Sequence, residues 1–566
     1  MRPPRTLRVV LILLGSLLWS ISAAFASAYN ARPKLVVVIV IDQFRGDYLE
    51  RYRDQFGEGG FRLFLDHGAY FAECNYDYAN TRTAPGHATL FTGTYTSGHG
   101  IIANEWWDPQ KKKRVTSVED DATKLVGLGT DQPGPGASPH NLMSDTLGDE
   151  LKLATGGQSR VFAISLKDRA AVLPVGFSGD AAYWIDPKSG SWITSSYYRP
   201  DLPDWVRNFN GSSPSQGRAE KFWNREWKDS EGNVLGSTAP RNGKDGSPAG
   251  FYEVVGSTPF ANEYQLEFAK ELVVYEKLGA NSATDLLIIS LSANDILGHQ
   301  VGPDSPQMRS MALELDRQLA DFFTFLGHQI GMANVWMALS ADHGVAPLPE
   351  FAKTLRLPAA NLDAKALREQ INAQLSKKYE KKADYVIDLD YPLAWLNAEA
   401  FVGTLGKSES VAEDNVGEAM KQAGFAGYFT KSQLARGEIP PTEIGRRYAH
   451  SYSPEGGWYV IGIPTPFHVG ITKGTDHATP FSYDTHVPLA FYGLAFQPGI
   501  YRNHAEPVDL AVTLASLLGI NPPTQATGRV LTEALQPTHQ SVAPDATLAP
   551  RPKSLQPLTP PDGDIQ

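Results

Sequence analysis

The stretch Leu35–Ile41 with the next residue, Asp42, reads LVVVIVID and decides the fold class. Seven apolar residues follow one another without a polar alternate, which is typical of a strand covered on both faces. Similar runs recur at residues 161–164, 286–291, 335–339 and 487–492. Helical periodicity lies between them, for example at residues 263–278 and 308–325. This alternation predicts an α/β sandwich with a mostly parallel central sheet flanked by helices.

Two long segments interrupt the alternation. Residues 182–260 are rich in Trp, Tyr, Gly, Ser and Pro with little periodicity, and residues 347–458 carry helices of their own, such as 363–379. We predict one catalytic domain over residues 27–536, with these two segments as insertions that form lids over a site. Residues 537–566 hold seven prolines and no aromatic residue, which predicts a disordered tail.

The N-terminus has the three parts of an export signal. Three arginines stand within the first eight residues, an apolar run covers residues 9–19, and the small-residue motif AFA ends at Ala26. An uncleaved anchor is the alternative, but a membrane-spanning helix needs about 20 apolar residues. We therefore predict a signal peptide over residues 1–26, a periplasmic or secreted location, and no stable membrane anchor after cleavage.

Charge and cysteine content exclude several classes of protein. The chain carries 51 Lys and Arg against 62 Asp and Glu, a net charge of −11. This gives no basic surface for nucleic acid, so we expect no nucleic-acid partner. The single cysteine, Cys74, can form neither an intrachain disulfide nor a cysteine-based zinc site. Any metal ion must therefore be held by histidines and carboxylates.

Acidic residues and histidines gather where the apolar runs end, and ligands of open α/β sheets bind outside the carboxyl ends of the strands. Taken singly, each is an ordinary cap, turn or surface residue. Together they offer enough oxygen and nitrogen donors for two divalent ions once a hydroxyl is added. The set is Asp42, Asp295, His299, Asp342, His343 and His486.

Local spacing supports the set. Asp295 and His299 are four residues apart, so a helical turn would place both on one face. Asp342 and His343 are adjacent, so both can face one site only at an irregular strand end. Residues 80–87 read NTRTAPGH and predict a turn followed by a helix that starts near Gly86. Thr83 would then lie just before a helix N-terminus, either as an ordinary N-cap or as a nucleophile aimed at an anion.

Five ordered stretches carry a family resemblance: ID at 41–42, TAPGH at 83–87, DILGHQVGP at 295–303, DHG at 342–344 and YDTHVP at 483–488. Together they resemble the alkaline phosphatase superfamily, in the branch shared with nucleotide pyrophosphatases/phosphodiesterases. The resemblance implies two zinc ions and a phosphothreonine intermediate at Thr83. It implies that one zinc is held by Asp295, His299 and His486, and the other by Asp42, Asp342, His343 and the Thr83 oxygen. His477 is the alternative to His486.

Substrate class follows from the remaining motifs. Sulfatases share the fold but need Cys or Ser where Thr83 stands, so that activity is rejected. Asn104 matches the residue that binds phosphoryl oxygens in both phosphodiesterases and monoesterases of this branch. Lys167 and Arg169 resemble the cationic pair of PafA-type bacterial alkaline phosphatases, although a solvated loop is the alternative for both.

We therefore predict a monomeric phosphate monoesterase that acts on small phosphate monoesters. A phosphodiesterase or nucleotide pyrophosphatase is the main alternative, and a non-catalytic phosphate-binding protein is a further one.

Overall fold

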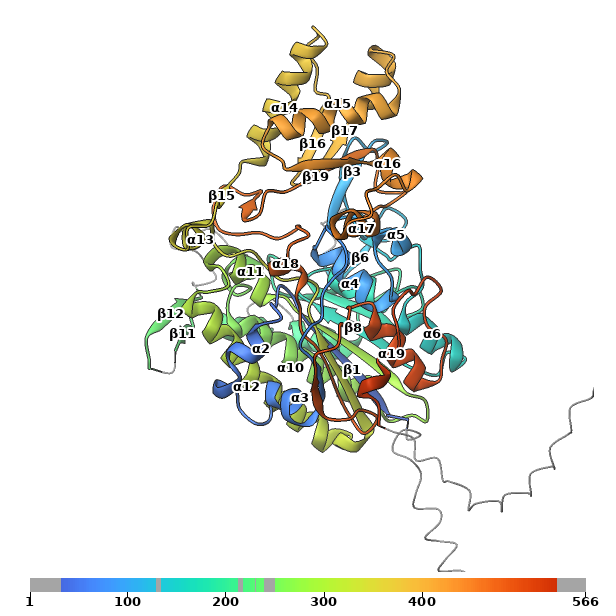
Figure 1. Cartoon of the computed structure of the whole chain (residues 1–566). Helices are drawn as coiled ribbons and strands as arrows, with labels where there is room; N and C mark the ends of the chain where they lie inside the picture. Colours follow the sequence, from blue (N-terminus) through green and yellow to red (C-terminus); the bar gives the residue numbers. More distant parts are fainter. Residues whose placement is uncertain (1–31, 129–133, 212–216, 230, 239–249, 537–566) are drawn as a thin grey trace, which may run out of the picture.

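A computed structural model describes residues 32–128, 134–211, 217–229, 231–238 and 250–536 (Figure 1). The predicted signal peptide and C-terminal tail lie outside these residues. The core is a ten-stranded sheet. In spatial order its strands are β22 (Gly499–Tyr501), β2 (Ala69–Phe71), β21 (Leu489–Tyr492), β14 (Val335–Ser340), β1 (Leu35–Ile41), β13 (Asp285–Leu291), β8 (Val161–Ser165), β9 (Ala181–Ile185), β10 (Trp192–Ser195) and β6 (Leu125–Val126).

Strand β1 occupies the centre of the sheet. It pairs in parallel with β13 on one side and β14 on the other, with Leu35 opposite both Asp285 and Val335. All seven of its residues are fully buried, as the continuous apolar run predicts. Strand β21 is antiparallel to β14, so the sheet is mixed but mostly parallel at its centre. The predicted fold class is confirmed.

Helices cover both faces of the sheet (Figure 1). On one face α10 packs against α12, and α12 also contacts α3 and α11. On the other face α4 packs against α7 and α19. Their bounds are α3 (Phe61–His67), α4 (Thr83–Thr92), α7 (Arg169–Val175), α10 (Pro259–Tyr275), α11 (Ala293–Val301), α12 (Pro306–Gln329) and α19 (Asp509–Leu518). The predicted helices at residues 263–278 and 308–325 thus correspond to α10 and α12.

The second interrupting segment carries a small sheet of its own, which is completed by a strand just past the segment's predicted end at residue 458. Its strand order is β16 (Val386–Asp390), β17 (Leu393–Leu396), β19 (Tyr459–Ile463) and β18 (Gly427–Thr430). Helices α14 (Ala364–Lys378) and α15 (Glu409–Gln422) pack on this sheet and enclose a separate apolar core. We call residues 364–463 the cap, which lies at the top of Figure 1, above the main sheet.

The first interrupting segment is less separate than the sequence suggests. Strand β9 starts at Ala181 and pairs in parallel with β8, and β10 follows it, so residues 181–195 extend the main sheet. Trp192 of β10 is fully buried and stacks on Phe268 of α10, with ring centroids 3.9 Å apart. Trp192 therefore packs in the main core. Among the residues described, no helix has the length and apolar character needed to cross a bilayer.

Candidate metal centre and nucleophile

The parallel arrangement of β14, β1 and β13 brings distant residues to one edge of the sheet. Asp42 follows β1 directly, and Asp342 and His343 follow β14. Asp295 and His299 lie on α11, which begins two residues after β13 ends. Because parallel strands end at the same edge, these side chains converge although they come from positions up to about 300 residues apart.

The first group consists of Asp42, Asp342 and His343, all fully buried, with ligand atoms within 4.8 Å of one another. The His343 Nε2 atom lies 3.6 Å from Asp42 Oδ1 and 3.6 Å from Asp342 Oδ2. None of these three atoms has a hydrogen-bond partner among the described residues. Buried polar atoms are rarely left unpaired. Three that point at one another fit a divalent cation, which all three could coordinate.

The second group consists of Asp295, His299 and His477, again with ligand atoms within 4.8 Å of one another. Asp295 Oδ1 lies 3.1 Å from His299 Nε2 and 3.9 Å from His477 Nε2. The expected helical spacing of Asp295 and His299 is therefore confirmed. The His477 ring also stacks on His343, with centroids 3.7 Å apart, so the two groups touch.

His486 lies apart from both groups, which corrects its assignment from sequence. Its Nε2 atom is 2.9 Å from the Ala72 carbonyl oxygen, and its ring packs so closely on Gly46 that a Cβ there would lie 2.6 Å from Nε2. The residue caps the short helix α18 (Ser482–Thr485) in an extended conformation just before the chain enters β21. That geometry directs the ring toward the backbone beside β2, and His477 takes the place expected for His486.

Hydrogen bonds orient all three clustered histidines in the same way. Nδ1 lies 2.8 Å from the Thr475 carbonyl oxygen in His299, 2.7 Å from that of Thr81 in His477, and 2.9 Å from that of Gly344 in His343. A carbonyl oxygen can only accept, so Nδ1 carries the proton and Nε2 presents a lone pair to its group. Metal-binding histidines are held this way. Imidazole and carboxylate donors without sulfur fit zinc.

The pKa values reflect crowded charges in a buried site. Burial, reinforced by Asp295 and Asp342, raises the pKa of Asp42 well above its usual value. Burial also opposes ionisation of Asp295, but Lys167 and His299 outweigh it and hold the pKa of that carboxyl well below its usual value. Burial and the neighbouring histidines depress the pKa of His477, which favours the neutral, ligating form.

Lys167 lies between the two groups. Its Nζ atom is 2.6 Å from Asp42 Oδ2 and 2.6 Å from Asp295 Oδ2, and its side chain is only 4% exposed. Arg169 begins α7 two residues later, and its Nε atom is buried without a hydrogen-bond partner among the described residues. The alternative of a solvated loop does not fit Lys167.

Thr83 is the first residue of α4, so the helix begins three residues earlier than expected from sequence. The residue is 1% exposed. Asn104 lies beside it, because its Oδ1 accepts a hydrogen bond of 2.8 Å from the Ala84 amide. This contact occupies the Asn104 oxygen and leaves its NH₂ group without a hydrogen bond among the described residues. Thr83 and Asn104 therefore meet at the N-terminal end of α4, where the helix favours anions.

His87 joins the Thr83 backbone to the first ligand group. Its Nδ1 atom lies 2.8 Å from the Thr83 carbonyl oxygen and 3.3 Å from Asp342 Oδ2. Its Nε2 atom lies 2.8 Å from Ser290 Oγ on β13. The Thr83 backbone and the first ligand group are thereby connected through one histidine.

Gln43 is a site residue that sequence reasoning missed. Its backbone amide donates to Asp342 Oδ1 at 3.0 Å, and its Nε2 donates to Asp295 Oδ1 at 2.7 Å, so it bridges both groups. Its φ of 63° is left-handed, and Asn294 fixes the turn by donating to the carbonyl oxygens of Asp42 and Gln43. Only its position next to Asp42 could have drawn attention, since glutamine is an uncommon zinc ligand.

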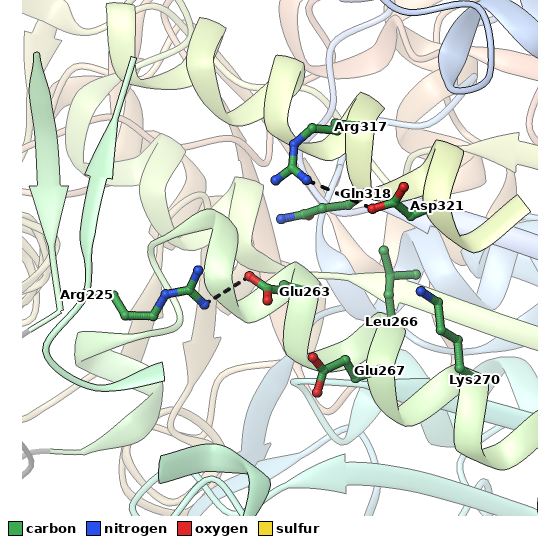
Figure 2. Close-up of a pocket in the computed structure, with 8 residues that line it drawn as sticks. All are labelled: Arg225, Glu263, Leu266, Glu267, Lys270, Arg317, Gln318 and Asp321. Atoms are coloured by element: carbon green, nitrogen blue, oxygen red, sulfur yellow. Dashed lines mark hydrogen bonds and ion pairs between the residues drawn. The ribbon is translucent and has the colours of Figure 1, made fainter. Parts of the chain in front are cut away.

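A hollow of about 340 Å³ lies on α10 and α12 (Figure 2). Two ion pairs lie along it: Arg225 is 3.0 Å from Glu263, and Arg317 is 4.0 Å from Asp321. None of its lining residues belongs to either ligand group, so the hollow is separate from the candidate site. The lining residues are Arg225, Glu263, Leu266, Glu267, Lys270, Arg317, Gln318 and Asp321.

Comparisons with known proteins agree with this geometry. Residues 36–440 match the family model for type I phosphodiesterase / nucleotide pyrophosphatase, and the chain belongs to this family. It is 32% identical to alkaline phosphatase PhoV of Synechococcus elongatus, over 89% of this chain and 94% of that protein. It is 33% identical to alkaline phosphatase PafA of Elizabethkingia meningoseptica, over 89% and 95%. A protein of Myroides odoratus named a calcium-transporting ATPase is 34% identical, over 91% and 97%.

Solved structures confirm the fold. The crystal structure of wild type alkaline phosphatase PafA superposes with a TM-score of 0.79 at 31% identity, over 89% of this chain and 99% of that one. The family resemblance drawn from the five sequence stretches is therefore confirmed.

Proposed function

We propose that this protein is a zinc-dependent alkaline phosphatase that hydrolyses phosphate monoesters through a phosphothreonine intermediate at Thr83. One observation carries the proposal: two groups of candidate ligand atoms converge beside a threonine at a helix N-terminus, and three of those atoms are buried without a hydrogen-bond partner among the described residues. The full-length similarity to two alkaline phosphatases supports the same conclusion.

Two ion sites follow from the donor groups. Asp295, His299 and His477 would hold one zinc ion. Asp42, Asp342, His343 and the Thr83 oxygen would hold the other. When bound, two such ions supply positive charge that lowers the pKa of a hydroxyl and neutralises phosphoryl oxygens.

The residues of the chain then have distinct tasks. The Thr83 oxygen attacks phosphorus, and its new bond to phosphorus forms as the bond to the leaving ester oxygen breaks. Water next attacks the phosphothreonine, which breaks the bond from Thr83 to phosphorus and releases inorganic phosphate. The Asn104 amide and the cations Lys167 and Arg169 stabilise charge on the non-bridging oxygens in both steps.

The cationic pair favours a monoester over a diester. A phosphate monoester carries one more negative charge than a diester, and a buried lysine beside an arginine suits the more charged group. A phosphodiesterase or nucleotide pyrophosphatase would instead need room for a second ester substituent. A protein that only binds phosphate would have no use for a buried threonine hydroxyl at this position.

We also propose that the chain is exported to the periplasm or secreted. The arginines, the apolar run and the AFA motif within residues 1–26 support an export signal.

Hydrolysis of an aryl phosphate tests the proposed function. We expect turnover to disappear with a chelator and to return with zinc. Thr83→Ala should lower kcat by roughly 10³-fold or more and abolish the acid-stable phosphoenzyme. Thr92→Ala is the matched control, because that hydroxyl donates to the Ala88 carbonyl oxygen of the same helix and accepts from the Thr94 amide. Near-normal turnover in Thr83→Ala would refute the nucleophile assignment.

A further inference from the structure

The cap contacts the loop that precedes the nucleophile candidate. Arg82, directly before Thr83, is 8% exposed, and its Nη1 donates to Asp390 Oδ2 of the cap at 2.7 Å. Its Nη2 donates to the Tyr391 carbonyl oxygen at 2.7 Å, and its Nε donates to Asn80 Oδ1 at 2.9 Å. Every nitrogen of this guanidinium is therefore engaged, and two of the three bind the cap. Arg82 is thus fixed in one orientation.

A second ion pair connects the cap to the hairpin that follows Asn104. The hairpin consists of β3 (Glu105–Asp108) and β4 (Lys113–Thr116), and Asn104 closes its base by accepting a backbone hydrogen bond of 2.9 Å from Ser117. Arg114 of β4 forms a two-point pair with Asp388, at 2.5 and 2.8 Å. The Asp388 side chain is 12% exposed, so the pair is largely shielded from water on that side.

Both aspartates come from one strand of the cap. Asp388 and Asp390 are two residues apart on β16, so their side chains share a face. Their partners on β17 are Trp395 and Leu393, which belong to an apolar cluster that the cap shares with the segments around Thr83 and Asn104. From those segments, including the hairpin, the cluster contains Ala79, Ile102, Ala103, Trp106 and Val115. The two ion pairs therefore lie on a packed interface.

We propose that Asp388 and Asp390 are positioning residues for the phosphoryl group. Asp390 acts on Thr83 through Arg82, and Asp388 acts on Asn104 through Arg114 and the hairpin. The proposal rests on the proposed function, since it needs Thr83 and Asn104 to contact the substrate. Small misplacements of reacting groups lower the reaction rate steeply: a displacement of about 1 Å lowers the rate roughly 10²-fold. A rigid strand that fixes both residues would serve to prevent this.

Neutral variants of the two aspartates test the proposal, assayed in the full-length zinc enzyme with an aryl phosphate. We expect Asp390→Asn to lower kcat by roughly 10- to 100-fold with a smaller change in KM, because Thr83 acts in the chemical step. We expect Asp388→Asn to weaken inhibition by inorganic phosphate, which the Asn104 amide binds. Glu438→Gln is the control, because Glu438 forms an exposed ion pair with Arg436 inside the cap and should change neither value.

A double-mutant cycle separates positioning from general stability. If Asp388 acts through Asn104, Asp388→Asn should not weaken phosphate inhibition any further in an Asn104→Ala background. Asp390→Asn should still lower kcat in that background. If Asp388→Asn has the same effect in both backgrounds, or if both variants match the wild type, the proposal is wrong. Should circular dichroism show that Asp390→Asn is unfolded, Arg82→Lys replaces it, with the same expected loss of kcat.

Failure of this proposal can be told from failure of the proposed function. An enzyme that loses turnover in Thr83→Ala but ignores both aspartate variants would retain the function and refute the cap's role. An enzyme in which Thr83→Ala is active would refute both.

Discussion

Removal of the Lys167 and Arg169 charges should change substrate preference, and the expected size follows from the structure. Lys167 is buried between the two ligand groups, and Arg169 carries a buried Nε without a partner among the described residues. A charge-assisted hydrogen bond contributes about 1.5 to 3 kcal/mol. Each cation that binds the additional charged oxygen of a monoester is therefore worth roughly 10- to 100-fold in kcat/KM, because 1.4 kcal/mol is tenfold.

The assay compares kcat/KM for a monoester and a matched diester with the same aryl leaving group. We expect the Lys167→Ala/Arg169→Ala double variant to lower the monoester-to-diester ratio by roughly two to four powers of ten. The loss should be larger for Lys167→Ala than for Arg169→Ala, because the lysine side chain is 4% exposed and the arginine side chain 24%.

Two controls accompany the comparison. Lys152→Ala removes another mostly buried lysine, paired with Asp180 at 2.7 Å, and should leave the ratio unchanged. Zinc content must be measured in each variant, because Lys167 also contacts Asp42 and Asp295. Equal losses on both substrates with zinc intact, or a wild type that prefers the diester, would refute the monoesterase reasoning and favour the phosphodiesterase.

Two further predictions concern metal binding and stability. His477→Ala should lower the bound zinc, measured by elemental analysis, by about one ion per chain, because His477 lies with Asp295 and His299. His486→Ala should leave the zinc content unchanged. The reverse result would restore His486 as the ligand, as assigned from sequence. Burial opposes the charge of Asp77, but His450 and Arg446 outweigh it and lower its pKa to about 2. Its stabilising effect is therefore present at pH 5, where His450 is charged because its own pKa is raised, and is lost as pH falls from about 4 toward 2. Asp77→Asn should lower the free energy of unfolding, measured by urea unfolding, by about 2 kcal/mol at pH 5 and by much less near pH 2.

The sequence by itself determined the central sheet and most members of the two candidate ligand groups. Runs such as Leu35–Ile41, short and rich in β-branched residues, are typical of strands in a doubly covered sheet, and parallel strands bring their carboxyl ends together. The placement of Asp295 and His299 on one helix face followed from their spacing of four residues. Such features depend on residues close in sequence or on a regular repeat, which is why they could be predicted.

Only the tertiary structure decided between His477 and His486. Both are single histidines in the irregular chain before β21, and neither lies in a periodic pattern. Which ring reaches Asp295 depends on long-range contacts, such as the bond from the Ala478 amide to the Thr81 carbonyl oxygen, which joins segments almost 400 residues apart. The bridge formed by Gln43 and the cap's hold on Arg82 have the same origin, because each exists only after distant segments have packed together.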